Sequence, residues 1–423
     1  MGMPYLNPME IAQHPNQRQQ PTADNPTRGG WPAVLAMTLC VSTLIASEFM
    51  PVSLLTPVAD GLQVSEGQAG LGIAVSGIFA VATSLFIAWA SRGIDRRTLF
   101  LGLTAAMLVS GVLVAFAPNY LFFMVGRALL GVAIGGFWSM STATVMRLVP
   151  EEAVPRALAL LNGGNALATT IAAPLGSYLG QFIGWRGAFF CVVPLAAVTF
   201  AWLFISLPNL PSRERASGVA AFKVLRRRQV PFGMLAISLF FMGQFALFTY
   251  LRPFLETVTA VDVTTLSLML LGLGVSGLAG TYAIGIALKR GLYGLLISMP
   301  LVMAAIAGGL VILGHSPVSV AVLLAAWGLI GTAAPVAWWT WLSRVLPGEV
   351  EAGGGLMVAV VQLAITLGAS VGGLLFDGWG YQATFLASAV LLILSGLVAW
   401  LAARGSRAAS DRSNPFRTAT PAN

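Results

Sequence analysis

The stretch Leu35-Ala-Met-Thr-Leu-Cys-Val-Ser-Thr-Leu-Ile-Ala-Ser-Glu-Phe-Met-Pro-Val-Ser-Leu-Leu55 is almost wholly apolar and contains one carboxylate, Glu48. About 20 apolar residues in a helix cross the roughly 30 Å of hydrocarbon in a bilayer. An ionisable side chain at that depth costs about 3 kcal/mol on insertion scales, so it is expected to serve a function. The stretch therefore predicts a transmembrane helix in which Glu48 is the leading candidate to carry a proton.

Apolar runs of this kind recur along the chain. Its 423 residues are 57% hydrophobic and 9% charged, and the mean hydropathy is +0.84. Twelve runs long enough to cross a membrane lie at about 32–57, 68–91, 98–117, 120–146, 157–183, 187–207, 231–254, 265–288, 292–314, 317–343, 354–376 and 381–403. We predict an all-α membrane protein with twelve transmembrane helices.

Basic residues set the expected orientation, because loops that carry Lys and Arg tend to stay on the cytoplasmic side. With a cytoplasmic N-terminus, 20 of the 23 Lys and Arg residues are cytoplasmic, Arg127 lies within a span, and Arg186 and Arg252 lie at the outer side. Both termini are then cytoplasmic. The net charge of +8 is explained by topology, and its scatter between spans argues against a nucleic-acid partner.

The chain divides into two halves. Residues 31–207 and 231–403 each hold six runs, joined by a polar cytoplasmic linker at 208–230; residues 1–30 and 404–423 are predicted to be disordered tails. At a shift of 197 residues, Arg147 matches Arg344 and Gly176 matches Gly373. At a shift of 194, Gly184-Trp185 matches Gly378-Trp379. Two pseudo-symmetric six-helix bundles around a midplane cavity are typical of secondary transporters.

Motifs in the first half resemble the major facilitator superfamily, and within it the drug/proton antiporter branch. Arg127, Gly131 and Gly135 match that branch's fourth-span R-x-x-x-G-x-x-x-G pattern, and Pro174 with Gly176 resembles its fifth-span motif. The resemblance implies the major facilitator fold. It also implies a carboxylate latch after the second span, but Arg92 stands where that Asp is usual, so Asp95, followed by Arg96, is the candidate replacement.

Other stretches resemble the bacterial purine ribonucleoside efflux pumps. They begin at Glu48-Phe-Met-Pro, Gly136-Phe-Trp-Ser, Gly243-Gln-Phe-Ala and Val361-Gln-Leu-Ala, and so fall in both halves. That family implies a proton-driven exporter of nucleosides such as inosine, embedded as a multi-pass protein in the bacterial inner membrane. The expected partners are a hydroxylated small molecule, protons and membrane lipid, and the expected state is a monomer.

Glu48 and Arg127 are the candidate proton-coupling residues. Desolvation disfavours an ionised carboxyl, so Glu48 could take up a proton on one side and release it on the other. The alternative is a neutral Glu48 that only braces helices. Arg127 could pair with Glu48 or could join spans by bonding backbone carbonyls, and the sequence favours neither. The resemblance links this Arg to proton coupling.

Polar and aromatic side chains at comparable depth are the candidates for binding a nucleoside. Amides would bond ribose hydroxyls, and aromatic faces would stack on the base. The candidates are Asn162, Asn165, Gln244, Tyr250, Gln362, Trp138 and Trp338, of which Gln244 and Gln362 are favoured. Asn165 and Gln362 match at the 197-residue shift. The alternative role for such residues is hydrogen bonding between helices.

The remaining functional classes find little support in the sequence. The two His residues are far apart and no Gly-Lys-Ser or Gly-Lys-Thr follows a glycine run, so neither a metal, a cofactor nor ATP is expected. An enzyme would need more ionisable groups at one depth. A sugar or multidrug proton antiporter of the same superfamily is the main alternative, and a membrane-embedded enzyme or a receptor or scaffold is a remote one.

Overall fold

The computed structural model describes residues 30–91, 93–211, 229–346 and 350–412, and these residues form helices and their connections. The first half contains α1 (Gly30–Ser53), α2 (Leu55–Leu62), α3 (Glu66–Ala90), α4 (Arg96–Ala115), α5 (Tyr120–Leu148), a single 3₁₀ turn (Glu151–Ala153), α6 (Val154–Phe190) and α7 (Val192–Ser206). The second half contains α9 (Gln229–Phe248), α10 (Leu251–Thr257), α11 (Val263–Ala287), α12 (Leu292–Leu313), α13 (Pro317–Gly331), α14 (Ala334–Val345) and α15 (Val350–Arg412). Arg92 and the greater part of the predicted tails and linker lie outside the described residues.

Ten stretches of the described chain are long and apolar enough to cross a membrane. Two of them, Glu151–Ser206 and Gly353–Arg404, are more than 50 residues long and therefore hold two crossings each. The chain turns between these crossings at Gly184 (φ 69°) and Gly380 (φ 77°), a backbone region that glycine adopts at little steric cost. The ten stretches thus supply the twelve expected crossings.

The positions of these two glycines differ in one respect from the match between the halves seen in the sequence. Sequence comparison pairs Gly184 with Gly378, but the residue that shares its conformation is Gly380, at a shift of 196 residues. Trp185 is buried, whereas Trp379 is exposed. The Gly-Trp pair at Gly378 therefore does not mark the turn of the second half. The helix α15 continues to Arg412, whereas its stretch apolar enough to cross a membrane ends at Arg404.

The repeat has a counterpart in the packing at the predicted shift of 197 residues. In the first half, a Cβ on Gly131 would lie 2.1 Å from the carbonyl oxygen of Ser76, so α3 and α5 meet backbone to backbone. In the second half, a Cβ on Gly328 would lie 2.0 Å from the carbonyl oxygen of Leu273, and α11 and α13 meet in the same way. Glycine at these two positions is what permits the approach.

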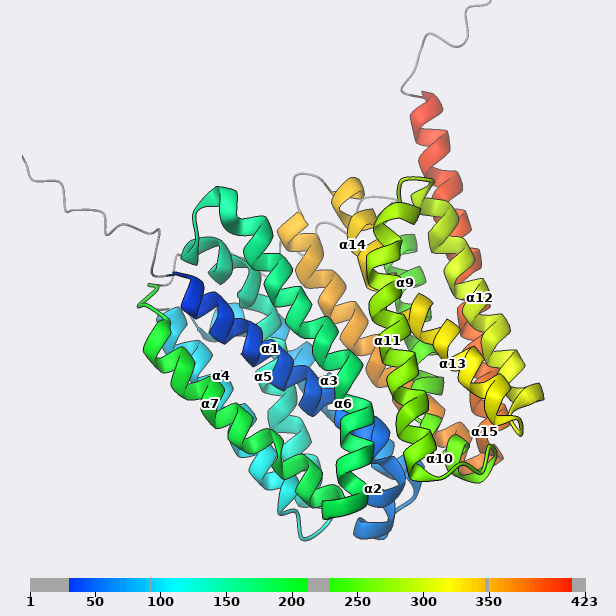
Figure 1. Ribbon diagram of the computed structural model, residues 1–423. Coiled ribbons are helices and arrows are strands. Elements are labelled where there is room, and N and C mark those ends of the chain that lie inside the picture. The colour runs from blue at the N-terminus through cyan, green and yellow to red at the C-terminus, as the bar shows by residue number, and fades with distance from the viewer. Residues whose placement is uncertain (1–29, 92, 212–228, 347–349, 413–423) are drawn as a thin grey trace, which may run out of the picture.

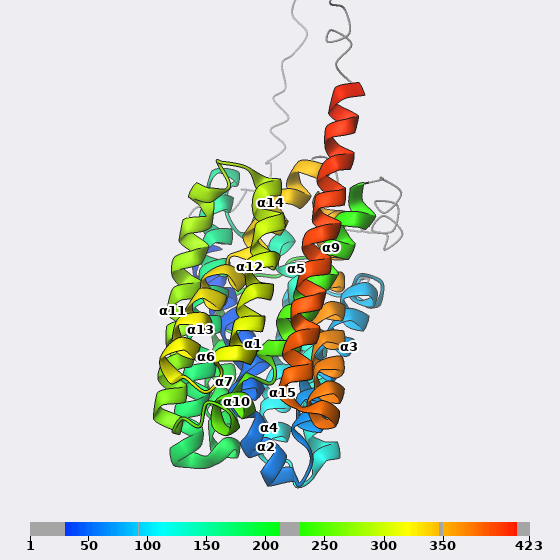
Figure 2. The same ribbon diagram turned by 90° about the vertical axis from the view of Figure 1, so that its right-hand side faces the viewer.

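The two halves stand side by side and meet along two seams, α3 against α15 and α6 against α11 (Figure 1). Figure 2 shows the final part of α15 running the height of the molecule beside α9. Here we call the end at which α1 begins and α15 ends the termini side, and the opposite end, where α2 and α10 lie, the loop side.

Candidate proton and substrate site

Glu48 lies on α1 at the contact between the two halves. Its side chain is 5% exposed, and Pro51 interrupts the hydrogen-bond ladder of the same helix one turn later. The Nε2 of Gln362, on α15, donates to its Oε1 at 3.5 Å. The predicted proton carrier and one predicted substrate residue are therefore neighbours across the boundary between the halves.

Arg127, on α5, is 1% exposed and binds both α1 and α3. Its Nε donates to the carbonyl of Gly72 at 3.0 Å, and its Nη1 donates to the carbonyl of Ser47 at 2.8 Å. Its Nη2 donates to the backbone carbonyl of Glu48 at 3.3 Å and to the Oγ of Ser76 at 3.1 Å. The guanidinium thus bonds the backbone of Glu48 and joins α5 to both α1 and α3.

The fourth-span motif forms one continuous face of α5 against α3. Gly131 follows Arg127 by one turn and meets Ser76, and Gly135 follows by two turns and meets Ala80, whose carbonyl oxygen would lie 2.1 Å from an added Cβ. Residues four apart lie on the same side of a helix. The two glycines hold α3 close enough for Arg127 to reach it.

Gln362 and Gln244 each carry a buried amide oxygen that has no hydrogen-bond partner among the described residues. Gln362 is 7% exposed, and Gln244, on α9, is half-buried beside Gly331 of α13. Buried polar atoms are nearly always paired in folded proteins, so an orphaned one needs a reason. Both amides are free to accept from a bound solute.

The remaining predicted substrate residues are less well placed. Tyr250 is fully buried, donates from its hydroxyl to the Ala369 carbonyl at 2.8 Å and stacks on Phe376, so it packs the seam. Trp338 is 2% exposed and packs edge-on against Trp341. In this conformation both side chains are engaged in packing, and their role in binding a solute stays a prediction.

Three further candidates remain accessible. Trp138 is half-buried and packs edge-on against Phe137. Asn165 is half-buried on α6. Asn162 is exposed and its Nδ2 donates to the carbonyl of Leu158, one turn earlier in the same helix, at 2.9 Å. That bond leaves the side-chain oxygen of Asn162 as its open acceptor.

Among the described residues, Asp95 makes no contact that would serve as the expected carboxylate latch between the halves. Its side chain accepts from the backbone N–H of Arg97 at 2.7 Å and so caps α4, and the N–H of Arg96 donates to Leu210, all within the first half. A cap of this kind satisfies a backbone donor that the helix leaves open. Asp95 is therefore a structural residue of its own half.

A carboxylate does join the two halves, but on the loop side. Asp377, at the end of the first crossing of α15, accepts from the N–H of Gly67 at 2.9 Å and from the hydroxyl of Ser65 at 2.5 Å. Ser65 and Gln68 cap α3 reciprocally, and Asp377 adds a negative charge at that positive helix end. Sequence reasoning missed Asp377 because it looks like an ordinary loop residue.

Arg252 forms a second loop-side connection that sequence reasoning missed. It is 5% exposed, lies on α10 and pairs with Glu256 at 2.8 Å. It also donates to the carbonyl of Ser53 on α1 and to the hydroxyl of Ser177 on α6. Its position four residues before an acid was the available signal. Both connections hold the halves together on the loop side.

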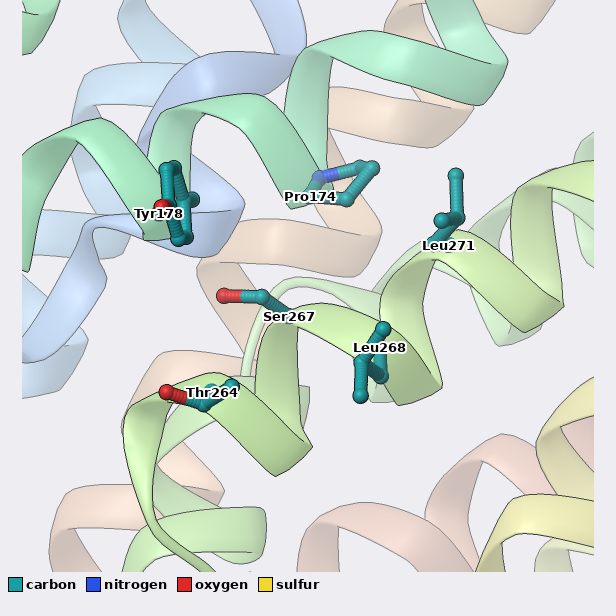
Figure 3. A pocket seen from close by; sticks show the side chains of 6 residues that line it. All are labelled: Pro174, Tyr178, Thr264, Ser267, Leu268 and Leu271. Carbon is teal, nitrogen blue, oxygen red and sulfur yellow. The ribbon is translucent and has the colours of Figure 1, made fainter.

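The fifth-span motif, Pro174 with Gly176, lies on α6, the helix that meets α11 of the other half. A Cβ on Gly176 would lie 2.7 Å from the hydroxyl oxygen of Ser53, so this glycine permits α1 and α6 to approach. Pro174 borders a hollow of about 180 Å³ between α6 and α11, which Tyr178, Thr264, Ser267, Leu268 and Leu271 also line (Figure 3). Glu48 and Gln362 are not part of its lining. This hollow therefore belongs to the seam and is separate from the candidate proton site.

The fold and this site define a class, the helical secondary transporters built from two six-helix halves. A family model described as the Major Facilitator Superfamily matches residues 35–352, and the chain belongs to that family. It is a multi-pass membrane transporter and not an enzyme.

Relatives and solved structures agree with this family. A Pseudomonas aeruginosa protein named "Transcription regulatory protein OpdE" is 58% identical over 386 residues, 90% of this chain and 96% of the relative. A Salmonella enteritidis protein named "Purine ribonucleoside efflux pump NepI" is 41% identical over 376 residues, 89% of this chain and 95% of the relative.

Two solved structures share the fold at low sequence identity. A bacterial homologue of the human lysosomal transporter Spinster, inward-facing and occupied, has a TM-score of 0.71 and 15% identity, covering 88% of this chain and 96% of that one. A D-xylose–proton symporter has a TM-score of 0.70 and 16% identity, covering 88% and 97%.

Proposed function

We propose that this transporter exports purine ribonucleosides such as inosine in exchange for protons. The observation that carries the proposal is the buried Glu48 carboxyl in hydrogen-bond contact with Gln362 of the other half. A carboxyl at that place can hold a proton, and its surroundings change when the two halves separate. The relatives named as purine ribonucleoside efflux pumps support the choice of substrate.

Alternating access follows from the way the halves touch. The contact between Glu48 and Gln362 joins α1 to α15, so rocking of one half against the other lengthens or breaks it. A charged Glu48 then loses a donor in a site of low polarity, which favours uptake of a proton. Proton binding and the movement of the halves are coupled through this one carboxyl.

The same proposal includes the setting of the protein. We place it in the inner membrane of a bacterium, as a monomer surrounded by lipid, with the termini side facing the cytoplasm. The distribution of Lys and Arg supports this orientation. The loop-side connections through Asp377 and Arg252 then close the outer side in the described conformation.

The alternatives within the superfamily are a sugar exporter and a multidrug exporter. The orphaned amide oxygen of Gln362, next to the carboxyl, favours a solute with hydroxyl or N–H donors over a lipophilic drug. The relative named as a transcription regulatory protein is similar in sequence to 90% of this chain, across both halves. A transporter that alters the level of a small molecule can change transcription without touching nucleic acid.

Transport in proteoliposomes tests the substrate. The purified protein is reconstituted, a pH gradient is imposed, and movement of radiolabelled inosine, arabinose and a lipophilic cation is followed in parallel. The proposal expects uphill movement of inosine that an uncoupler abolishes. Movement of only arabinose or only the cation would reject nucleosides as the substrate in favour of that class of solute. Equal inosine movement without a pH gradient would reject proton coupling.

A further inference from the structure

The neighbourhood of Glu48 and Gln362 has more acceptors than donors. An ionised carboxylate has about four acceptor positions. Among the described residues, the hydrogen-bond donor to this carboxylate is the Gln362 amide, at 3.5 Å. The amide oxygen of Gln362 is buried and has no hydrogen-bond partner among the described residues. Leaving such acceptors empty costs about 1–3 kcal/mol for each buried group.

Nearby donors are already engaged elsewhere. Arg127 donates to three backbone carbonyls and to Ser76. The hydroxyl of Ser47 donates to Thr43 at 2.9 Å, and the hydroxyl of Thr366 donates to the carbonyl of Gln362 itself at 2.8 Å. The described residues near Glu48 therefore do not supply the missing donors, which points to a ligand that carries them.

The charges around Glu48 favour a neutral ligand. Among the described residues, three charged side chains contact α1: Arg127 from α5, Arg252 from α10, and Arg156 from α6, which stacks on Trp31 at the start of α1. Arg252 is paired with Glu256. Arg127 lies beside Glu48, so the two together carry little net charge and give a cation no strong attraction.

We propose that Glu48 and Gln362 bind two neighbouring hydroxyl groups of a neutral solute, and that in a ribonucleoside these are the 2′ and 3′ hydroxyls of the ribose. One hydroxyl donates to the carboxylate, and the other donates to the amide oxygen of Gln362. Glu48 and Gln362 thus recognise the ribose, and other residues recognise the base. This inference rests on the proposed function, whose substrate recognition it makes specific.

The same arrangement explains exchange of the solute for a proton. The charged carboxylate accepts from hydroxyls, whereas the protonated carboxyl has lost acceptor capacity and gained an O–H of its own. The solute therefore binds the charged form better, and by linkage bound solute holds the proton off Glu48. When the solute leaves, the proton returns to a Glu48 oxygen, as antiport requires.

Binding to the purified wild-type transporter tests the inference without a variant. Radiolabelled inosine is displaced by inosine, 2′-deoxyinosine and 2′,3′-dideoxyinosine, well above and well below neutrality. In the alkaline series, we expect the dideoxy compound to bind roughly ten- to a hundredfold more weakly than inosine, because it lacks donors to a charged acceptor. The preference should shrink in the acid series. Equal affinities in the alkaline series would overturn the inference.

Two variants separate recognition from packing. Gln362→Leu should reduce the preference for inosine over 2′,3′-dideoxyinosine, and a preserved preference would count against the role of Gln362. The matched control is Gln382→Leu, an exposed glutamine on the same helix, which should keep the wild-type preference.

Failure of the inference and failure of the proposed function give different results. Inosine binding that ignores the ribose hydroxyls leaves the function standing and rejects the inference. Binding of arabinose in place of inosine, with the same pH dependence, supports hydroxyl recognition by the pair and rejects the nucleoside. Binding of neither solute rejects both.

Discussion

Leu324 occupies in the second half the place that Arg127 occupies in the first, since the two residues are separated by the repeat of 197 and both are fully buried. The helix contacts that follow them are alike, with Gly131 against Ser76 and Gly328 against Leu273. The duplicated framework was therefore kept while a charged group was placed in the first half alone. This asymmetry supports the proposal that proton coupling takes place at the α1, α3 and α5 contact.

Replacing Arg127 by Lys should destabilise the protein and impair transport. An ammonium cannot reproduce the fork that bonds Ser47, Gly72 and Glu48 together, so several buried carbonyls lose their donors. We expect a loss of about 1–3 kcal/mol or more in unfolding free energy. Thermal unfolding in detergent measures it. Arg290→Lys, at an exposed arginine, is the control, and equal stability of the two variants would refute the structural role.

Gly131→Ala and Gly328→Ala should each be destabilising. The new Cβ would lie 2.1 Å or 2.0 Å from a backbone carbonyl oxygen, which forces the helices apart and costs about 1–3 kcal/mol. Gly102→Ala is the matched control, because nothing lies within 4 Å of its Cβ and alanine is the better helix former. Thermal melts of the three variants should rank Gly102→Ala highest; a tie would mean that the close helix contacts are absent.

Asp377→Ala should loosen the loop side. The variant loses the acceptor that joins Ser65 and Gly67 of the first half to α15, so conformations open on this side become more populated. Spin labels at Asp60 and Ala260, in a background without the two native cysteines, report the distance between the halves by pulsed electron resonance. A longer or broader distance distribution is expected.

Asp262→Ala is the control for that experiment. Asp262 also lies on the loop side, but it caps α11 within its own half, where donation from the hydroxyl and N–H of Thr265 holds its pKa below the usual range. Its loss should leave the inter-half distance as it is in the wild type. If Asp262→Ala broadens the distance distribution as much as Asp377→Ala does, the role of Asp377 in joining the two halves is wrong.

Much of the fold follows from patterns that the sequence displays directly. Long apolar runs predicted twelve crossings, and the spacing from Arg127 to Gly135 matched a family motif that lies along one face of α5 in the structure. These features depend on hydrophobicity and period, which are local properties. The helical extension to Arg412 and the turn at Gly380 depend on backbone conformation, which residue identity alone does not specify.

The site was only partly predictable for a related reason. Burial of Glu48 and Arg127 could be inferred because an ionisable residue in an apolar run is visible in sequence. The hydrogen-bond partner of Glu48 could not be inferred, because Gln362 lies 314 residues away in the sequence and approaches Glu48 only where the two halves meet. Tyr250 and Trp338 look like ligand-binding residues in the sequence. In the structure the hydroxyl of Tyr250 bonds a backbone carbonyl, and the ring of Trp338 packs against another tryptophan.

The most direct test is pH-driven transport by Glu48→Gln in proteoliposomes. Glutamine keeps the size of the side chain and its contact with Gln362, but it cannot carry a proton. The account predicts that the variant loses uphill inosine movement under a pH gradient while it retains measurable exchange of labelled for unlabelled inosine. Uphill, pH-driven transport by the variant at the wild-type rate would contradict the assignment of Glu48 as the proton carrier.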